Sequence, residues 1–175
     1  MKIEILSHKE LVQRAFQSPP SNLIFISNPE QPFEAERSKD AVNKFVHKLI
    51  LLFDDKESAS PDRNTPQKQH VRDALRFAEG LDELVVSCRM GTSRSAAIAF
   101  AVVAQRSGMV NAFQILNPIR HSPNALIISY VEELLELPYL IKAMESWKKG
   151  QRQEFEYHIA EHQATLKRRE ELRFK

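Results

Sequence analysis

The sequence predicts an α/β fold in which helices flank a central, mostly parallel sheet. Short apolar runs of strand length alternate with segments that carry helix signals, which is the pattern of parallel strands joined by helices. The chain has 175 residues, of which 42% are hydrophobic, so it can form one domain with a sizeable core. From Trp147 onward most residues are charged. We therefore predict a main domain over residues 1–146 and a charged helical extension over residues 147–175.

Each predicted strand is a short apolar run between polar or proline-containing segments. These runs span residues 1–6, 22–27, 45–53 and 83–87. In the first run Ile3 and Ile5 share one face, because side chains alternate along a strand. The second and third runs are largely apolar, which predicts buried strands. Residues 28–40 are polar and contain prolines, so we predict a loop there.

Caps, prolines and glycines mark the predicted helices, and glycine is informative because the chain contains only 4. Thr65 has the character of a helix cap, with Pro66 at the first helical position, and Gly80 would end that helix. The predicted helices span residues 8–16 (capped by Ser7 and ended by Pro19 and Pro20), 66–79, 96–105 (before Gly108), 111–115, and 125–147 with a break near Pro138.

Charge, cysteine content and hydropathy exclude several classes of protein. The 25 Lys and Arg residues nearly balance the 23 Asp and Glu residues, which gives no global field of the kind that nucleic-acid binders have. The longest apolar run, residues 96–104, is well short of the roughly 20 residues that span a bilayer. Lys2 and Glu4 lie where a signal peptide would be apolar. We expect a soluble cytoplasmic protein that binds neither nucleic acid nor membrane, with its oligomeric state left open.

The extension is predicted to be an amphipathic helix, because Phe155, Ile159 and Leu166 recur at helical spacing. It would pack on the domain or fray from it. His158 and His162 are four positions apart and could share a metal ion, but no third ligand is evident. We predict that they lie on a solvated helix face and that the protein holds no metal.

The strongest functional signal is the sequence SCRMGTSRS, residues 87–95. Cys88, the only cysteine, follows a predicted strand at the edge where open α/β sheets bind ligands. A loop that enters a helix N-terminus directs backbone N–H groups at one point, which suits phosphate. Arg94 can hold two phosphate oxygens in a fork, and the positive surroundings favour the thiolate of Cys88. We predict a phosphate-binding loop over residues 88–95, called the phosphate loop below; the alternative is a structural cysteine beside a helix start.

Cys88 and Arg94 have the spacing Cys-x5-Arg, with Gly91 three positions after the cysteine and Ser95 directly after the arginine. This loop resembles the signature of the cysteine-dependent protein tyrosine phosphatase superfamily. The stretch Arg120-His-Ser-Pro-Asn-Ala-Leu is similar to one in its dual-specificity branch. Over residues 23–135 the chain resembles short bacterial-type predicted tyrosine phosphatases.

The resemblance implies a phosphomonoester hydrolase with a tyrosine-phosphatase-like fold and no cofactor. Cys88 would attack the phosphorus and form a cysteinyl-phosphate, and Ser95 would donate a hydrogen bond to the departing sulfur. The phosphate-binding residues would be Arg89, Met90, Gly91, Thr92, Ser93 and Arg94. The substrate would be a phosphorylated protein or a small phosphomonoester, with phosphotyrosine, phosphoserine, phosphothreonine and phosphoinositide all open.

The superfamily's general acid is an aspartate upstream of the cysteine, in a loop after a neighbouring strand. Asp54 and Asp55 follow the predicted strand 45–53. We favour Asp55, because the resemblance aligns best with the second residue of the pair, and Asp54 is the alternative. Asp62 is a poorer third choice. A purely structural interpretation is that both carboxylates cap a loop.

Ser87 departs from the resemblance, because the superfamily usually has histidine before the cysteine. A serine hydroxyl can replace a hydrogen bond but carries no charge, so we expect a slower enzyme. A pseudophosphatase that binds phosphorylated partners is the alternative. Thiol-based arsenate reductases are disfavoured because they relay oxidation through further cysteines, and rhodanese-type sulfurtransferases because their loops usually lack the serine after the arginine.

Two arginines near these motifs each have two interpretations. Arg120 could reach the phosphate or pair with a carboxylate on a helix, and we favour the pair. Arg89 could favour very anionic substrates or simply face solvent, and we favour the solvent-facing cation. We expect His121 to be structural.

Overall fold

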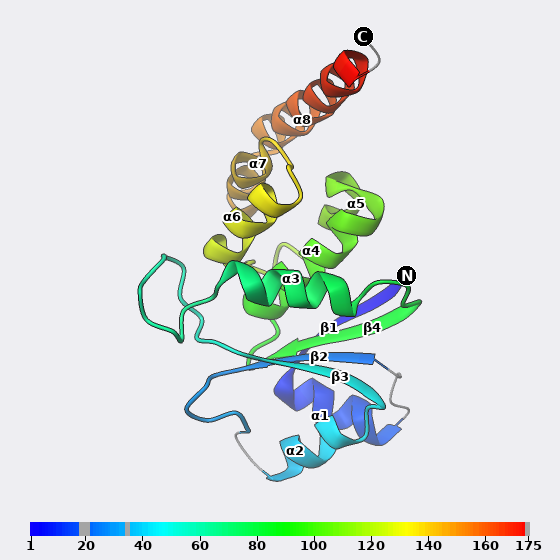
Figure 1. Cartoon of the computed structure of the whole chain (residues 1–175), viewed down its shortest axis with the longest axis vertical. Coiled ribbons are helices and arrows are strands. Elements are labelled where there is room, and N and C mark those ends of the chain that lie inside the picture. The colour runs from blue at the N-terminus through cyan, green and yellow to red at the C-terminus, as the bar shows by residue number, and fades with distance from the viewer. Residues whose placement is uncertain (18–21, 34–35, 174–175) are drawn as a thin grey trace.

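A four-stranded parallel sheet forms the centre of the computed structural model, which describes residues 1–17, 22–33 and 36–173 (Figure 1). Its strands are β1 (Lys2–Ser7), β2 (Asn22–Ser27), β3 (His47–Leu52) and β4 (Glu83–Cys88). They pair in the order β1-β4-β2-β3, and every pairing is parallel. The predicted α/β fold is confirmed. Because parallel strands end at the same edge of a sheet, the four segments that follow these strands meet there.

Helices cover both faces of the sheet. Because side chains alternate along a strand, an apolar strand places apolar side chains on both faces, and both faces have to be covered. On one face α1 (His8–Gln17) and α2 (Glu36–Asn43) pack against Leu23, Phe25 and Val85. On the other face a larger core joins the sheet to α3 (Lys68–Phe77), α4 (Arg94–Ser107) and α5 (Met109–Gln114). Figure 1 shows α1 and α2 below the sheet and α3, α4 and α5 above it.

α4 lies in the middle of the larger core, and its residues from Arg94 to Ala104 are all buried. This burial explains the continuous apolar run at 96–104. The helix begins at Arg94, slightly before the predicted start, and Gly108 ends it with a φ of 84°. The phosphate loop is therefore held between a buried strand and a buried helix.

The predicted loop at 28–40 is wrong in its second half, because α2 begins at Glu36. Its buried stripe of Ser38, Ala41 and Val42 is short and is surrounded by charged residues, so the sequence gives little helical periodicity. Residues 34 and 35 lie outside the described residues. The helix-ending prolines predicted at 19 and 20 also lie outside them.

Two further predictions about boundaries and burial are wrong. β3 is an edge strand rather than a buried one, so Ile50 and Leu52 are 41% and 38% exposed. α3 begins at Lys68 rather than Pro66. Gln67 and His70 form the capping box there, because the His70 ring accepts the backbone N–H of Gln67 at 3.1 Å.

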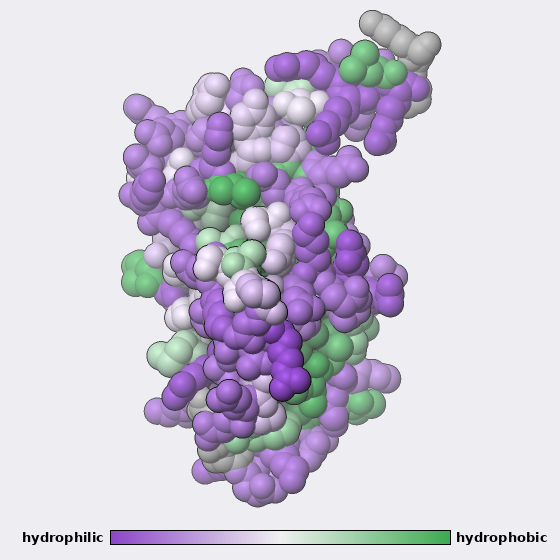
Figure 2. Space-filling view, turned by 60° about the vertical axis from the view of Figure 1, so that its left-hand side comes forward, coloured by the Kyte–Doolittle hydropathy of each residue, from purple (hydrophilic) through white to green (hydrophobic). Residues whose placement is uncertain are grey.

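The predicted helix at 125–147 is two helices, α6 (Ala125–Leu134) and α7 (Leu140–Lys148), and the predicted break near Pro138 is confirmed. The extension forms α8 (Arg152–Arg173), whose first turns pack on the domain through a ring contact of 4.9 Å between Phe155 and Phe113. Its far end projects from the domain with a mainly hydrophilic surface (Figures 1 and 2). The division of the chain after residue 146 stays a prediction.

The predicted solvated histidine face on α8 is wrong. His162 is 3% exposed, and its Nδ1 lies 2.9 Å from the carbonyl oxygen of Pro138. Within the described residues no group of three His, Cys, Asp or Glu side chains is placed to hold a metal ion. No helix in the described part of the chain is long and apolar enough to cross a membrane.

Candidate active site

The phosphate loop lies at the carboxyl edge of the sheet, where β4 ends at Cys88 and α4 begins at Arg94. Gly91 makes its tight turn possible, with a φ of 69° that side chains rarely adopt. A Cβ atom at this position would lie 2.6 Å from the backbone nitrogen of Ser7. Only glycine fits here, because both the backbone angle and the close approach of β1 exclude a side chain.

Neighbouring segments hold the backbone carbonyls of the phosphate loop. The carbonyl of Arg89 accepts the N–H of His8 at 3.3 Å, and that of Thr92 accepts the N–H of Ser122 at 2.9 Å. In a trans peptide the N–H lies opposite the carbonyl of the preceding residue. The N–H groups of Met90 and Ser93 therefore point away from these neighbours, and backbone N–H groups of such a loop can bind an anion.

The thiol of Cys88 and the hydroxyl of Ser95 lie together under the loop. Sγ is 3.0 Å from Oγ, and the two residues are 2% and 0% exposed. A hydroxyl can donate to sulfur, so Ser95 can stabilise a negative charge there. The structure thus brings together the two side chains that the sequence assigned to the nucleophile and its hydrogen-bond donor.

Arg94 is held on one side and unsatisfied on the other. Its Nη1 donates to the carbonyl of Phe53 at 2.7 Å and to Oδ1 of Asn28 at 3.0 Å, and the residue is 3% exposed. Its Nε is buried and has no hydrogen-bond partner among the described residues. A buried donor without a partner calls for a ligand, and the Nε edge of a guanidinium is one that can grip two phosphate oxygens.

Both candidate acids reach this site. Oδ1 of Asp55 accepts from Oγ of Ser93 at 2.7 Å and from Nδ2 of Asn124 at 2.8 Å, and its Oδ2 lies 3.8 Å from Nε of Arg94. Asp54 instead accepts from Nδ2 of Asn28 at 2.9 Å. Asp62 is exposed and pairs with Lys56, away from the phosphate loop.

Sequence reasoning missed two asparagines that position these groups. Asn28 links Arg94 to Asp54 by donating with one side-chain atom and accepting with the other. Asn124 is fully buried, donates to Asp55, and caps α6 by accepting the N–H of Ile127 at 3.0 Å. Asn124 lies in the stretch that resembles the dual-specificity branch, whereas nothing in the local sequence marks Asn28.

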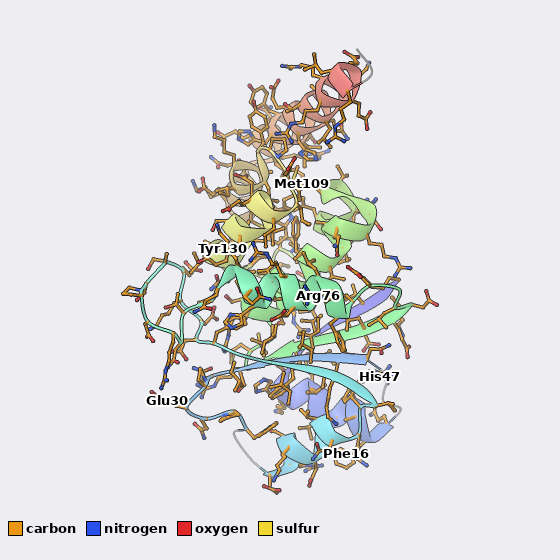
Figure 3. The ribbon with its side chains drawn as sticks, in the orientation of Figure 1. Phe16, Glu30, His47, Arg76, Met109 and Tyr130 are labelled. Carbon is orange, nitrogen blue, oxygen red and sulfur yellow. The ribbon has the colours of Figure 1, made fainter. Side chains whose placement is uncertain are left out.

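A hollow of about 350 Å³ adjoins the phosphate loop. The residues that line it are all of polar or charged types: Ser27, Asn28, Glu30, Gln31, Asp54 and Arg89. Figure 3 shows Glu30 on the loop that follows β2. The hollow shares Asn28 and Asp54 with the site and therefore lies beside it.

Ser87 and Arg120, two further residues singled out from the sequence, differ in their contacts. Ser87 is fully buried, and its Oγ has no hydrogen-bond partner among the described residues, so it does not supply the hydrogen bond expected of it. Arg120 pairs with Glu10 of α1 at 2.5 Å, as favoured from the sequence. Burial opposes ionisation of Glu10, but hydrogen bonds from Ser7 and Arg120 outweigh it and lower the pKa of that carboxyl.

His121 has the structural contacts that the sequence analysis expects. Its Nδ1 accepts the N–H of Asn117 at 3.0 Å. Burial lowers the pKa of the imidazole, and the neighbouring Arg120 lowers it further. Arg89 is exposed, as expected of a solvent-facing cation.

No protein-family model matches the sequence, and no curated protein matches it. The structure is similar to that of human DUSP28, with a TM-score of 0.53 and 21% identity over 77% of this chain and 91% of that one. It is also similar to PTPMT1 in complex with PI(5)P, with a TM-score of 0.51 and 16% identity over 83% of this chain and 93% of that one. The chain therefore has the same fold as these two structures.

Proposed function

We propose that this protein hydrolyses phosphomonoesters through a cysteinyl-phosphate intermediate formed on Cys88. One observation carries the proposal: a buried thiol 3.0 Å from a hydroxyl donor shares a loop with an arginine whose buried Nε has no hydrogen-bond partner among the described residues. The fold of known phosphatases supports the same chemistry.

In the first step the Cys88 thiolate attacks the phosphorus of the bound ester. The new S–P bond forms as the P–O bond to the leaving group breaks, and Asp55 gives its proton to the departing oxygen. The loop N–H groups and Arg94 bind the other phosphate oxygens, where negative charge has to be stabilised in the transition state.

In the second step water attacks the cysteinyl-phosphate. Asp55 takes a proton from this water, an O–P bond forms, and the S–P bond breaks to release inorganic phosphate. The sulfur leaves as a thiolate, to which Ser95 donates its hydrogen bond. The enzyme then returns to its starting state without any external reductant or cofactor.

Asp55 is favoured as the acid by its position. Its Oδ1 accepts a hydrogen bond from Ser93 of the phosphate loop, and its Oδ2 lies 3.8 Å from Nε of Arg94. Asp54 lines the polar hollow instead. The leaving oxygen would lie beside Asp55, and the rest of a phosphorylated protein or small phosphomonoester would extend toward this hollow.

A pseudophosphatase that binds phosphorylated partners is the second candidate. The buried Ser87, whose hydroxyl has no hydrogen-bond partner among the described residues, favours it, because the residue before the cysteine gives the loop neither charge nor a hydrogen bond. The phosphate-binding geometry is the same in both candidates, so only turnover distinguishes them.

The first test is hydrolysis of para-nitrophenyl phosphate from pH 5 to 8 by the wild type and by Cys88→Ser. We expect turnover that disappears in the variant, while both proteins bind vanadate or phosphate and melt at similar temperatures. Wild-type binding of vanadate without turnover would support the pseudophosphatase. A wild-type protein that shows no turnover and binds no anion would contradict both candidates.

A further inference from the structure

We propose that His8 is a positioning residue that holds the first part of the phosphate loop, and with it Cys88, in its reactive geometry. The inference rests on the proposed function only in that Cys88 is the reactive group. His8 is the first residue of α1 and is only 4% exposed. Its contacts join three separate segments of the chain.

The backbone of His8 holds the residue that follows Cys88. Its N–H donates to the carbonyl of Arg89 at 3.3 Å, which extends the pairing of β1 with β4 beyond the ends of both strands. The imidazole reaches a different strand: Nε2 lies 3.1 Å from the carbonyl oxygen of Ile26. A carbonyl can only accept, so Nε2 carries a proton and donates it to this bond.

The ring of His8 crosses the end of β4 to make this contact. β4 lies between β1 and β2, and Ser87 is in register with Leu6 on one side and Phe25 on the other. The ring starts from the end of β1 and stacks on Phe25, with centroids 4.4 Å apart and an angle of 18°. Its path passes over the α1 face of β4 at Ser87, where a small side chain leaves the space that an imidazole needs.

The contact at Ile26 connects His8 to the rest of the site. Asn28, two positions further along, orients both Arg94 and Asp54. His8 therefore fixes the spacing between the start of the phosphate loop and the segment that aims the arginine. Loss of such a support allows displacements of the reacting groups, and a misplacement of about 1 Å can lower a rate by about 10²-fold.

The test uses the reactivity of Cys88, which is the only cysteine in the chain. The rate of its alkylation by iodoacetamide is measured from pH 5 to 9 in the wild type and in His8→Ala. We expect the alkylation profile of the variant to move to higher pH, with a rate at pH 6.5 lowered about tenfold. This measurement does not require turnover.

His162→Ala is the matched control. His162 is 3% exposed and also contacts a backbone carbonyl, but it lies on α8, away from the phosphate loop. We expect this variant to lower Tm while leaving the alkylation profile unchanged. If His8→Ala behaves in the same way as this control, His8 is a core residue only and the proposal is wrong.

A second pair of variants keeps the proposal testable should His8→Ala fail to fold. Ser87→His alone would overfill the space above β4 and lower Tm, whereas the double variant His8→Ala/Ser87→His would place an imidazole in the vacated space and restore the alkylation profile at least in part. A Ser87→His variant with the wild-type Tm would show that the His8 ring does not fill the space over Ser87, which would overturn the proposal. If the alkylation rate of Cys88 depends on His8 but the wild type does not hydrolyse para-nitrophenyl phosphate, this inference is supported and the proposed function is wrong.

Discussion

The phosphate loop and the acidic loop, residues 54–64, lie at the same edge of the sheet but are built in opposite ways. In the phosphate loop Cys88, Arg94 and Ser95 are almost fully buried. In the acidic loop residues 57–63 are all exposed, and the backbone closes on itself where the N–H of Asp54 donates to the carbonyl of Asn64 at 2.7 Å. Side-chain hydrogen bonds at its first residues tether it to the site.

This difference matches the two tasks of the proposed reaction. Donors that stabilise transition-state charge act best when they are fixed in advance, because they need no reorganisation during the reaction. A general acid has to exchange protons and let the substrate in and out, which suits an exposed and lightly tethered segment. Changes in the phosphate loop should therefore affect both stability and activity, and changes in the acidic loop should affect activity alone.

The largest effect is expected from Arg94→Lys, which keeps the charge but loses the planar fork. We expect kcat/KM for para-nitrophenyl phosphate to fall about 10³-fold. Arg106→Lys, at the other end of α4, is the matched control and should have wild-type kinetics. Near-normal kinetics in Arg94→Lys would show that the guanidinium does not bind the reacting phosphate.

Asp55→Asn should lower kcat about 10²-fold with phenyl phosphate, whose leaving oxygen needs a proton, and should leave Tm nearly unchanged. Asp62→Asn, in the same loop, controls for the loss of an exposed charge. Asp54→Asn should have a much smaller effect. The reverse ranking of Asp54 and Asp55 in steady-state kinetics would assign the acid to Asp54.

Gly91→Ala should destabilise the fold by about 3 kcal/mol, because the new Cβ would meet both an unfavourable φ and the backbone of β1. Gly80→Ala isolates the cost of the unfavourable φ, since Gly80 has a φ of 75° but a Cβ atom at this position would have no neighbour within 4 Å. That variant should lose only about 1 kcal/mol. Urea unfolding of both variants measures the difference, and equal losses would show that the phosphate loop can move away from β1.

The smallest effect concerns two histidines, one beside each loop. Burial lowers the pKa of His70, next to the acidic loop, and of His121, next to the phosphate loop, from the ordinary histidine value of 6.5. The folded state therefore favours the neutral ring, whose Nδ1 accepts a backbone N–H in both cases. Their contribution to stability is complete above about pH 6.5 and is lost as pH falls below it.

Melting curves between pH 8 and pH 5 test this prediction. Tm of the wild type should fall toward pH 5, and His70→Gln and His121→Gln should each reduce the slope, because glutamine accepts a hydrogen bond without titrating in this range. Only His121→Gln should also change phosphate affinity, since its segment adjoins the phosphate loop. Unchanged slopes would show that neither ring is held neutral.

The local sequence predicted the strand-loop-helix unit around Cys88 well, while its phosphate binding stays a prediction. Cys88, Gly91, Arg94 and Ser95 lie within one strand-loop-helix unit, so their relative positions follow from the geometry of adjacent residues. Gly91 could be singled out because a tight turn favours glycine. The helix break at Pro138 was predictable for a similar reason, since proline lacks the N–H that continues a helix.

The partners of these residues were not predictable in this way. Asn28 and Asn124 are 66 and 69 positions away from the groups they contact, Arg94 and Asp55 respectively. His8 meets Ile26 across an intervening strand. The sequence around an asparagine or a histidine does not predict such a contact, because the strand order of the sheet decides which segments become neighbours.

The amino-acid sequence by itself determined the fold class and the loop between β4 and α4 that we propose to bind phosphate. The tertiary structure alone decided which side chains support that loop, that β3 lies at an exposed edge, and that His162 is buried. The physical reason is the range of the interactions. Backbone preferences and residue spacing act between near neighbours in the chain, whereas hydrogen bonds and packing across the sheet edge exist only after the parallel strands have assembled.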